Sequence, residues 1–156
     1  NYKNPTKMFS IVYTNSENKD FQELVQQLDK DLAIRDGDDH EFYKQINHTA
    51  VLKYAILIYQ NEIPVGCGAL KILTDEILEV KRIFVPEKFR GKGIATLIVN
   101  ELEKWAKNLN YNTLVLETGI NQPEAIQLYK KLNYTFIPNY GPYKNLETSI
   151  CFEKKY

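Results

Sequence analysis

The chain lacks the features that mark membrane, secreted and disulfide-rich proteins. No apolar run approaches the roughly 18 residues that a membrane-spanning helix needs, and no secretory signal is visible. Only two cysteines occur, Cys67 and Cys151, and they form no C-x-x-C pattern. We expect two buried thiols, because free cysteine behaves as a small apolar residue, with a disulfide or a metal pair as the alternative. These features predict a cytoplasmic protein.

The chain also lacks net charge. Its 156 residues include 20 basic and 20 acidic side chains, so no overall field favours nucleic acid or an anionic membrane as a partner. Any anion site must therefore be local. The length predicts one domain over residues 8–156, preceded by a flexible arm or an expression remnant at residues 1–7. The sequence leaves open whether the chain forms a homodimer.

Hydrophobic periodicity predicts eleven elements in the order β-α-α-β-β-β-α-β-α-β-β. The predicted strands are 8–13, 51–59, 65–73, 77–85, 113–118, 134–137 and 148–152, and the predicted helices are 20–35, 39–46, 94–109 and 123–132. The strand, helix, strand order around 94–109 implies one parallel crossover, whereas the three strands before it form an antiparallel meander. The fold class is therefore α/β, with a mixed, mostly antiparallel sheet flanked by helices. Gly66 and Gly68 indicate either a bulge or an element packed against bare backbone.

A basic turn at residues 90–95, reading R-G-K-G-I-A, lies where a strand gives way to a helix. Unpaired amides and the positive end of the helix dipole can hold an anion at such a place, and phosphate is the first expectation. A turn without a ligand is the alternative. A dinucleotide fingerprint fits less well, because Thr96 stands at its third glycine and the preceding strands are predicted to be antiparallel.

These residues resemble the GNAT N-acetyltransferase superfamily. Residues 90–95 fit that family's R/Q-x-x-G-x-G/A acyl-CoA loop, and residues 125–134, reading A-I-Q-L-Y-K-K-L-N-Y, are similar to its A-x-x-L-Y-x-x-x-G-F segment. Asn133 replaces the usual glycine, and asparagine tolerates the same left-handed backbone. The resemblance covers residues 8–152 and implies a GNAT-like fold that uses acetyl-CoA and no metal.

The resemblance also implies a binding site for acetyl-CoA. The amides that would cradle its pyrophosphate belong to Arg90, Gly91, Lys92, Gly93, Ile94 and Ala95. Main chain at Ile83, Phe84 and Val85 would pair with the pantetheine arm, and one backbone N–H there would polarise the acetyl carbonyl. Asn121 would bond the same arm, unless it only caps the next helix.

Two residues are candidates for proton transfer. Tyr129 matches the tyrosine of the family segment and would protonate the departing thiolate, although a tyrosine on an apolar helix stripe is usually a core residue. Glu79 resembles a glutamate that deprotonates the amine in some GNAT enzymes, often through water. Alternatively, Glu79 is an outward strand residue that pairs with Lys81 or Arg82.

The acceptor site is less clear from sequence. Arg35, Asp36 and His40 lie in the first helical connection, which often lines the acceptor pocket in this superfamily, and Tyr140 and Tyr143 could face it. Neighbouring carboxylates suit a cationic amine but are also normal helix caps.

We therefore predict acetyl transfer to a primary amine, most simply of a small molecule. The alternatives are a protein N-terminal or lysine acetyltransferase and a non-catalytic acyl-CoA-binding sensor. The acceptor's identity and the strictness for acetyl stay open.

Overall fold

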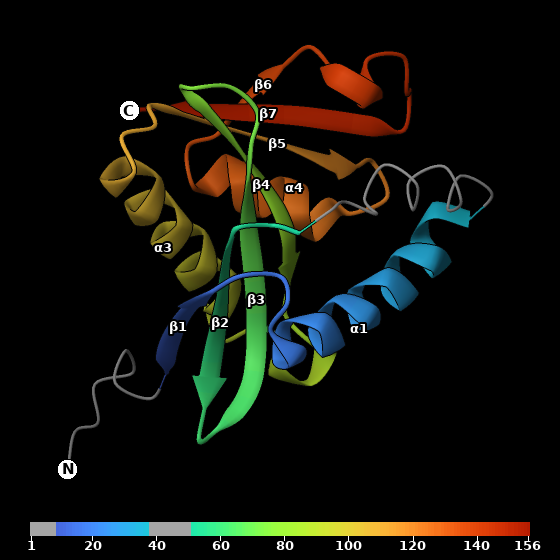
Figure 1. The fold of residues 1–156 in the computed structure, drawn as a ribbon. Helices are drawn as coiled ribbons and strands as arrows, with labels where there is room; N and C mark the ends of the chain where they lie inside the picture. Colours follow the sequence, from blue (N-terminus) through green and yellow to red (C-terminus); the bar gives the residue numbers. More distant parts are fainter. Residues whose placement is uncertain (1–8, 38–50) are drawn as a thin grey trace.

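Figure 1 shows the fold in a computed structural model, which describes residues 9–37 and 51–156. The strands are β1 (Ser10–Thr14), β2 (Tyr54–Gln60), β3 (Ile63–Ile72), β4 (Ile77–Phe84), β5 (Thr113–Gly119), β6 (Thr135–Ile137) and β7 (Ser149–Lys155). The helices are α1 (Lys19–Asp36), α3 (Ile94–Asn108) and α4 (Pro123–Lys131), with short 3-10 turns η3 (Glu87–Phe89) and η4 (Gly141–Tyr143). The helix predicted at 39–46 lies outside the described residues.

Within the described residues, the seven strands form one sheet in the order β1-β2-β3-β4-β5-β7-β6. β4 and β5 are parallel, and the other neighbouring pairs are antiparallel. The predicted fold class and the single parallel crossover are therefore confirmed. Asn61 and Glu62 both have positive φ, 50° and 66°, and they form the tight connection expected between β2 and β3.

Helix α3 packs on one face of the sheet against the two strand glycines. A Cβ at Gly68 would lie 2.6 Å from Cγ2 of Ile98, and a Cβ at Gly66 would lie 2.8 Å from Cγ2 of Ile94. Close packing therefore requires glycine at both positions. The register of β3 also shifts against β2 beside Gly66, and it shifts against β4 opposite Gly68. Both explanations that the sequence offered for these glycines are present.

Helix α1 covers the opposite face, over β2, β3 and β4. Asn18 caps its N-terminus by accepting a 2.9 Å hydrogen bond from the amide of Asp20. Phe21 and Leu24 then bury their side chains against a second core cluster that includes Leu57 of β2. Side chains in the C-terminal half of the helix line the same cavity as residues of β4 and β5. Cys67 and Cys151 are both free and buried, as predicted.

The described ranges, 9–37 and 51–156, contain no helix that is both long and apolar enough to cross a membrane.

Candidate active site

The site is a cleft that forms because β4 and β5 separate. Their ladder joins Ile77, Leu78 and Glu79 to Thr113, Leu114 and Val115, and among the described residues it includes no further pair. Each strand nevertheless continues, β4 to Phe84 and β5 to Gly119. Arg82, with a φ of 60°, forms part of a bulge that bends β4 here. A cavity of about 430 Å³ fills the divergence, bordered by β4, β5, α1, α4 and the loop before α3.

The loop before α3 offers open backbone to one end of this cavity. Gly91 and Gly93 both have a φ of 79°, and an added Cβ at either would meet no atom within 4 Å. Gly93 is the N-cap of α3, and no side chain caps the helix there. The free first-turn amides, the helix dipole and the open glycines suit an anionic group such as a phosphate. Six residues were predicted to cradle the pyrophosphate with their amides. Five of them line the cavity, namely Arg90, Gly91, Gly93, Ile94 and Ala95, whereas Lys92 does not.

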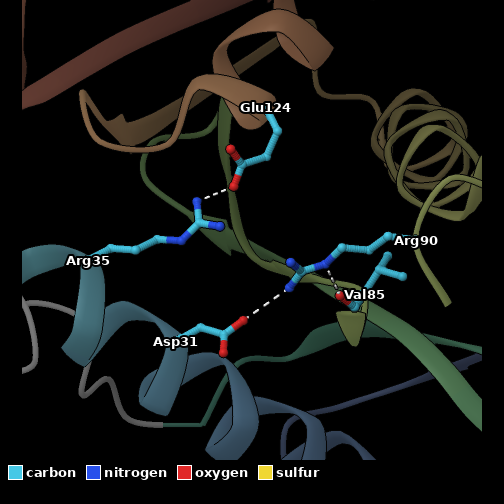
Figure 2. A network of polar contacts seen from close by, with 5 residues as sticks. All are labelled: Asp31, Arg35, Val85, Arg90 and Glu124. Carbon is cyan, nitrogen blue, oxygen red and sulfur yellow. Dashed lines mark hydrogen bonds and ion pairs between the residues drawn. The ribbon is translucent and has the colours of Figure 1, made fainter. Parts of the chain in front are cut away.

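Two arginines connect the walls of the cleft at this end (Figure 2). Arg90 donates through Nε to the carbonyl oxygen of Val85 at 2.8 Å, which fixes the loop to the end of β4. Its Nη2 lies 3.0 Å from Oδ2 of Asp31 on α1. Arg35, also on α1, forms an ion pair with Glu124 in the first turn of α4. Helix α1 is therefore tied both to the glycine loop and to α4.

Tyr129 lines the cavity from α4 and also belongs to the main core. Its ring packs edge-on against Tyr134, with centroids 5.6 Å apart, and lies 6.0 Å from the ring of Phe152. Burial raises the pKa of the Tyr129 phenol, so the group stays protonated at neutral pH. Tyr129 is thus a core residue, and it also lines the cavity, where the proton donor predicted from sequence would have to lie.

Glu79 is only 4% exposed and lines the same cavity from β4. The alternative that Glu79 faces outward is therefore wrong, because Tyr140 and Tyr143 of the loop that carries η4 pack over this part of β4. Oε2 of Glu79 accepts a hydrogen bond from the hydroxyl of Tyr140, and Oε1 lies 3.5 Å from Nζ of Lys81. Pairing of Glu79 with Lys81 was foreseen. Arg82 instead lies 3.0 Å from Asp29 on α1.

Lys81 and Tyr143 complete a buried polar cluster around Glu79. Nζ of Lys81 donates to the hydroxyl of Tyr143 at 3.3 Å, and the rings of Tyr140 and Tyr143 lie edge to face at 5.7 Å. Burial lowers the pKa of Lys81, although the Glu79 carboxylate opposes this shift. Burial and the same carboxylate raise the pKa of both tyrosines. Of the two tyrosines predicted from sequence, Tyr143 lines the cavity, whereas Tyr140 does not and reaches the site only through its hydrogen bond to Glu79.

The remaining predicted residues differ in their positions. Ile83, Phe84 and Val85 line the cavity as expected. Asn121 does not line it, and its side-chain amide donates to the carbonyl oxygen of Arg35 at 3.4 Å. The capping role considered for Asn121 is wrong, because Gln122 holds the N-cap position of α4 and no side chain caps that helix. The side chain of Asp36 and all of His40 lie outside the described residues.

Several cavity residues escaped the sequence analysis. Glu117 lines the cavity from β5, and its Oε2 accepts a 2.6 Å hydrogen bond from the hydroxyl of Ser149. Strand alternation could have found it, because Val115 pairs with Glu79 and Glu117 is two residues further on the same face. Asp31 was also missed; it lies four residues before the predicted Arg35 on α1, so a charged pair on one helix face was the available signal.

Known proteins that resemble this chain identify its family. The acetyltransferase (GNAT) family profile matches residues 14–134. This chain belongs to the GNAT family. GNAT proteins are acyltransferase enzymes, and the predicted family resemblance is confirmed. A crystal structure from Klebsiella pneumoniae, provisionally named an acyl-CoA N-acyltransferase, superposes on this chain with a TM-score of 0.80. The two are 28% identical, and the match covers 95% of this chain and 97% of the other.

Two further relatives illustrate the breadth of the GNAT family. IAA acetyltransferase of Azospirillum brasilense is 37% identical over 91 residues, which are 58% of this chain and 60% of the relative. A GNAT family acetyltransferase of Elizabethkingia anophelis, solved with acetyl-CoA bound, has a TM-score of 0.68 at 21% identity and covers 96% of this chain and 99% of its own. The matches to the first three curated relatives span 60%, 26% and 38% of their lengths.

Proposed function

We propose that this GNAT protein is an N-acetyltransferase that moves an acetyl group from acetyl-CoA to the primary amine of a small molecule by direct attack. The observation that carries the proposal is the separation of β4 from β5 beyond Glu79. It creates one cavity with Glu79 on one wall, Tyr129 on another and the glycine loop at one end. A thioester placed between these groups would have a base, an acid and a phosphate site in reach.

The donor would be held by the glycine loop and by the end of β4. The amides of Gly91, Gly93 and the first turn of α3 suit its pyrophosphate, because they are open and carry no side-chain cap. Main chain at residues 83–85 would pair with the pantetheine arm, and the bulge at Arg82 supports this by bending β4 beside the cavity. The bound donor supplies the activated acetyl thioester.

In the proposed reaction the amine nitrogen forms a bond to the acetyl carbon as the carbon–sulfur bond breaks. Glu79 takes the proton that the amine loses, through a water molecule, because Tyr140 and Lys81 already contact its two oxygens. Tyr129 gives a proton to the departing sulfur. Burial makes the phenol a weaker acid, but it also destabilises a thiolate in the same cavity, and the two effects offset one another.

Glu79, Lys81 and Tyr143 are buried polar residues that all line the cavity, and this polar lining supports a compact polar acceptor. A protein N-terminus or lysine as acceptor, and a sensor that binds acyl-CoA without turnover, are the competing functions. We also propose a cytoplasmic location, which the two free, buried thiols support.

The test combines binding and turnover on the same protein. Acetyl-CoA should raise the melting temperature, and a panel of small amines should include at least one that releases free CoA thiol with one acetylated amine for each thiol. Thermal stabilisation without thiol release from any small amine, peptide N-terminus or lysine peptide would instead identify a sensor. Release with peptides alone would identify a protein acetyltransferase.

A further inference from the structure

The C-terminal half of α1 forms one wall of the cleft. Four of its side chains line the cavity, namely Leu28, Asp31, Leu32 and Arg35. The two leucines supply apolar surface, whereas the two charged residues reach across to other elements (Figure 2). Asp31 contacts Arg90 before α3, and Arg35 contacts Glu124 of α4. The charged contacts of α1 therefore lie where the glycine loop and α4 border the same cavity.

The main chain of Arg35 is held in place by a contact from another segment. The side-chain amide of Asn121, in the connection between β5 and α4, donates to the carbonyl oxygen of Arg35. The Arg35 side chain is 30% exposed and the Glu124 side chain 57%, so solvent and solutes reach the pair. The arginine is thus anchored at its main chain, while its charged end meets a carboxylate that can move away.

The charges at this end of the cavity favour an exchange in which Arg35 leaves Glu124 and binds a phosphate. An exposed ion pair such as Arg35 with Glu124 is weak, and forming it favours the paired state over the separated side chains by less than about one order of magnitude. A charge-assisted, two-pronged contact from arginine to phosphate contributes about 10–100-fold in affinity. Arg35 therefore gains by leaving Glu124 for a phosphate. Arg90 is less free to do so, because Nε is bonded to Val85 and Nη2 to Asp31.

We propose that Arg35 binds a phosphate of the acyl donor and that Glu124 is the carboxylate it leaves when the donor arrives. This inference rests on the proposed function and assigns Arg35 to the donor, whereas the sequence suggested the acceptor. Glu124 then weakens binding of the acyl donor in two ways, because it pairs with the Arg35 guanidinium and because its charge repels the phosphates. Its pKa is lowered despite burial, by its own backbone amide and by Arg35, so it is ionised at neutral pH.

The experiment compares variants by calorimetric titration with CoA, dephospho-CoA and pantetheine, which share the arm but differ in phosphates. Arg35→Gln should weaken CoA binding about 10–100-fold and leave pantetheine binding or inhibition unchanged. Glu124→Gln should tighten CoA binding about 2–5-fold, because it removes a competing charge. Lys30→Gln is the matched control, since Lys30 is exposed on the same helix and does not line the cavity.

Dephospho-CoA identifies the phosphate that Arg35 binds. If the loss in Arg35→Gln disappears with dephospho-CoA, the contact is to the 3′-phosphate, and if the loss persists, the contact is to the pyrophosphate. Arg35→Lys, which keeps the charge without the two-pronged geometry, should bind CoA with intermediate affinity and serves if the glutamine variant does not fold.

Three results would overturn the inference while the proposed function stands. They are equal CoA affinity in wild type and Arg35→Gln, an equal loss for CoA and pantetheine in that variant, and weaker CoA binding in Glu124→Gln. A wild-type protein that binds no CoA at all would overturn the proposed function, and with it this inference.

Discussion

The hydroxyl of Tyr140 donates a hydrogen bond to the carboxylate of Glu79, a residue 61 positions earlier in the chain. This contact joins the loop before β7 to the middle of β4, at the point where β4 leaves β5. The carboxylate is consequently buried and oriented by the loop. A residue that sequence alone could treat as a surface glutamate thus becomes part of the cleft.

The first prediction concerns this pair. Glu79→Gln should lower kcat/KM by about 10²–10⁴-fold, because a carboxamide cannot take the amine proton. Tyr140→Phe should lower it by only about 10-fold, because the base remains but loses one orienting hydrogen bond. Steady-state thiol release measures both. Glu76→Gln, an exposed residue in the turn before β4, is the control. Full activity in Glu79→Gln would remove this residue from proton transfer.

The second prediction separates chemistry from binding at Tyr129. Tyr129→Phe should lower kcat by about 10²–10⁴-fold and leave the affinity for acetyl-CoA nearly unchanged, because only the proton donor is lost. Tyr134→Phe is the matched control, since its ring contacts that of Tyr129 and does not line the cavity. Comparable turnover in wild type and Tyr129→Phe would show that another group protonates the sulfur.

The third prediction tests the packing that fixes α3 behind the cleft. Gly68→Ala would place a Cβ 2.6 Å from Ile98 and 2.7 Å from Ile83, so it should lower the free energy of unfolding by about 1–3 kcal/mol. Gly119→Ala meets nothing closer than 3.4 Å and should cost much less. Adding Ile83→Val to Gly68→Ala removes the Cδ1 atom that lies 2.7 Å from the new Cβ, so it should restore part of the loss. Urea unfolding measures all three, and equal losses at Gly68 and Gly119 would contradict the packing argument.

The fourth prediction follows from the buried thiols. Burial raises the pKa of Cys67 to about 12, whereas an unfolded thiol titrates near about 8.5, so the native protein holds this proton more tightly. The stability that this proton contributes is fully present below the pKa of the unfolded thiol, and it is lost as the pH rises toward the pKa of the folded protein. The free energy of unfolding should therefore fall above pH of about 8.5, by up to about 1.4 kcal/mol per pH unit for each such group.

Urea titrations between neutral pH and about 10.5 test this slope against Cys67→Ala. The variant should show a shallower decline than wild type, because one titrating group has been removed. Cys151, whose pKa burial raises to about 11, contributes a smaller share. Parallel pH profiles for wild type and Cys67→Ala would refute the assignment.

The sequence predicted the fold well because the signals are local. Period-3.6 stripes placed α1, α3 and α4, and the strand, helix, strand order around α3 indicated the parallel crossover. Asn110 and Asn133 have φ of 67° and 70°, as expected for asparagine ending a helix in place of glycine. Each of these features depends on residues close together in the chain.

The site was predictable only in part, because its decisive contacts are distant in sequence. The burial of Glu79 depends on Tyr140, and the position of Arg35 depends on Glu124, 89 residues later. No periodicity encodes such pairs. Asn121 shows the limit clearly, since its residue type fitted both a cofactor contact and a helix cap, yet it contacts the carbonyl oxygen of Arg35.

A crystal structure of the acetyl-CoA complex would show directly whether the cleft holds the thioester between Tyr129 and Glu79. We expect the pyrophosphate to lie against the amides of residues 91–95, with the sulfur within about 2.6–3.2 Å of the Tyr129 hydroxyl or one water away. The acetyl carbon should lie on the side of the cavity that faces Glu79. A thioester placed away from both Tyr129 and Glu79 would exclude the proposed acid and base.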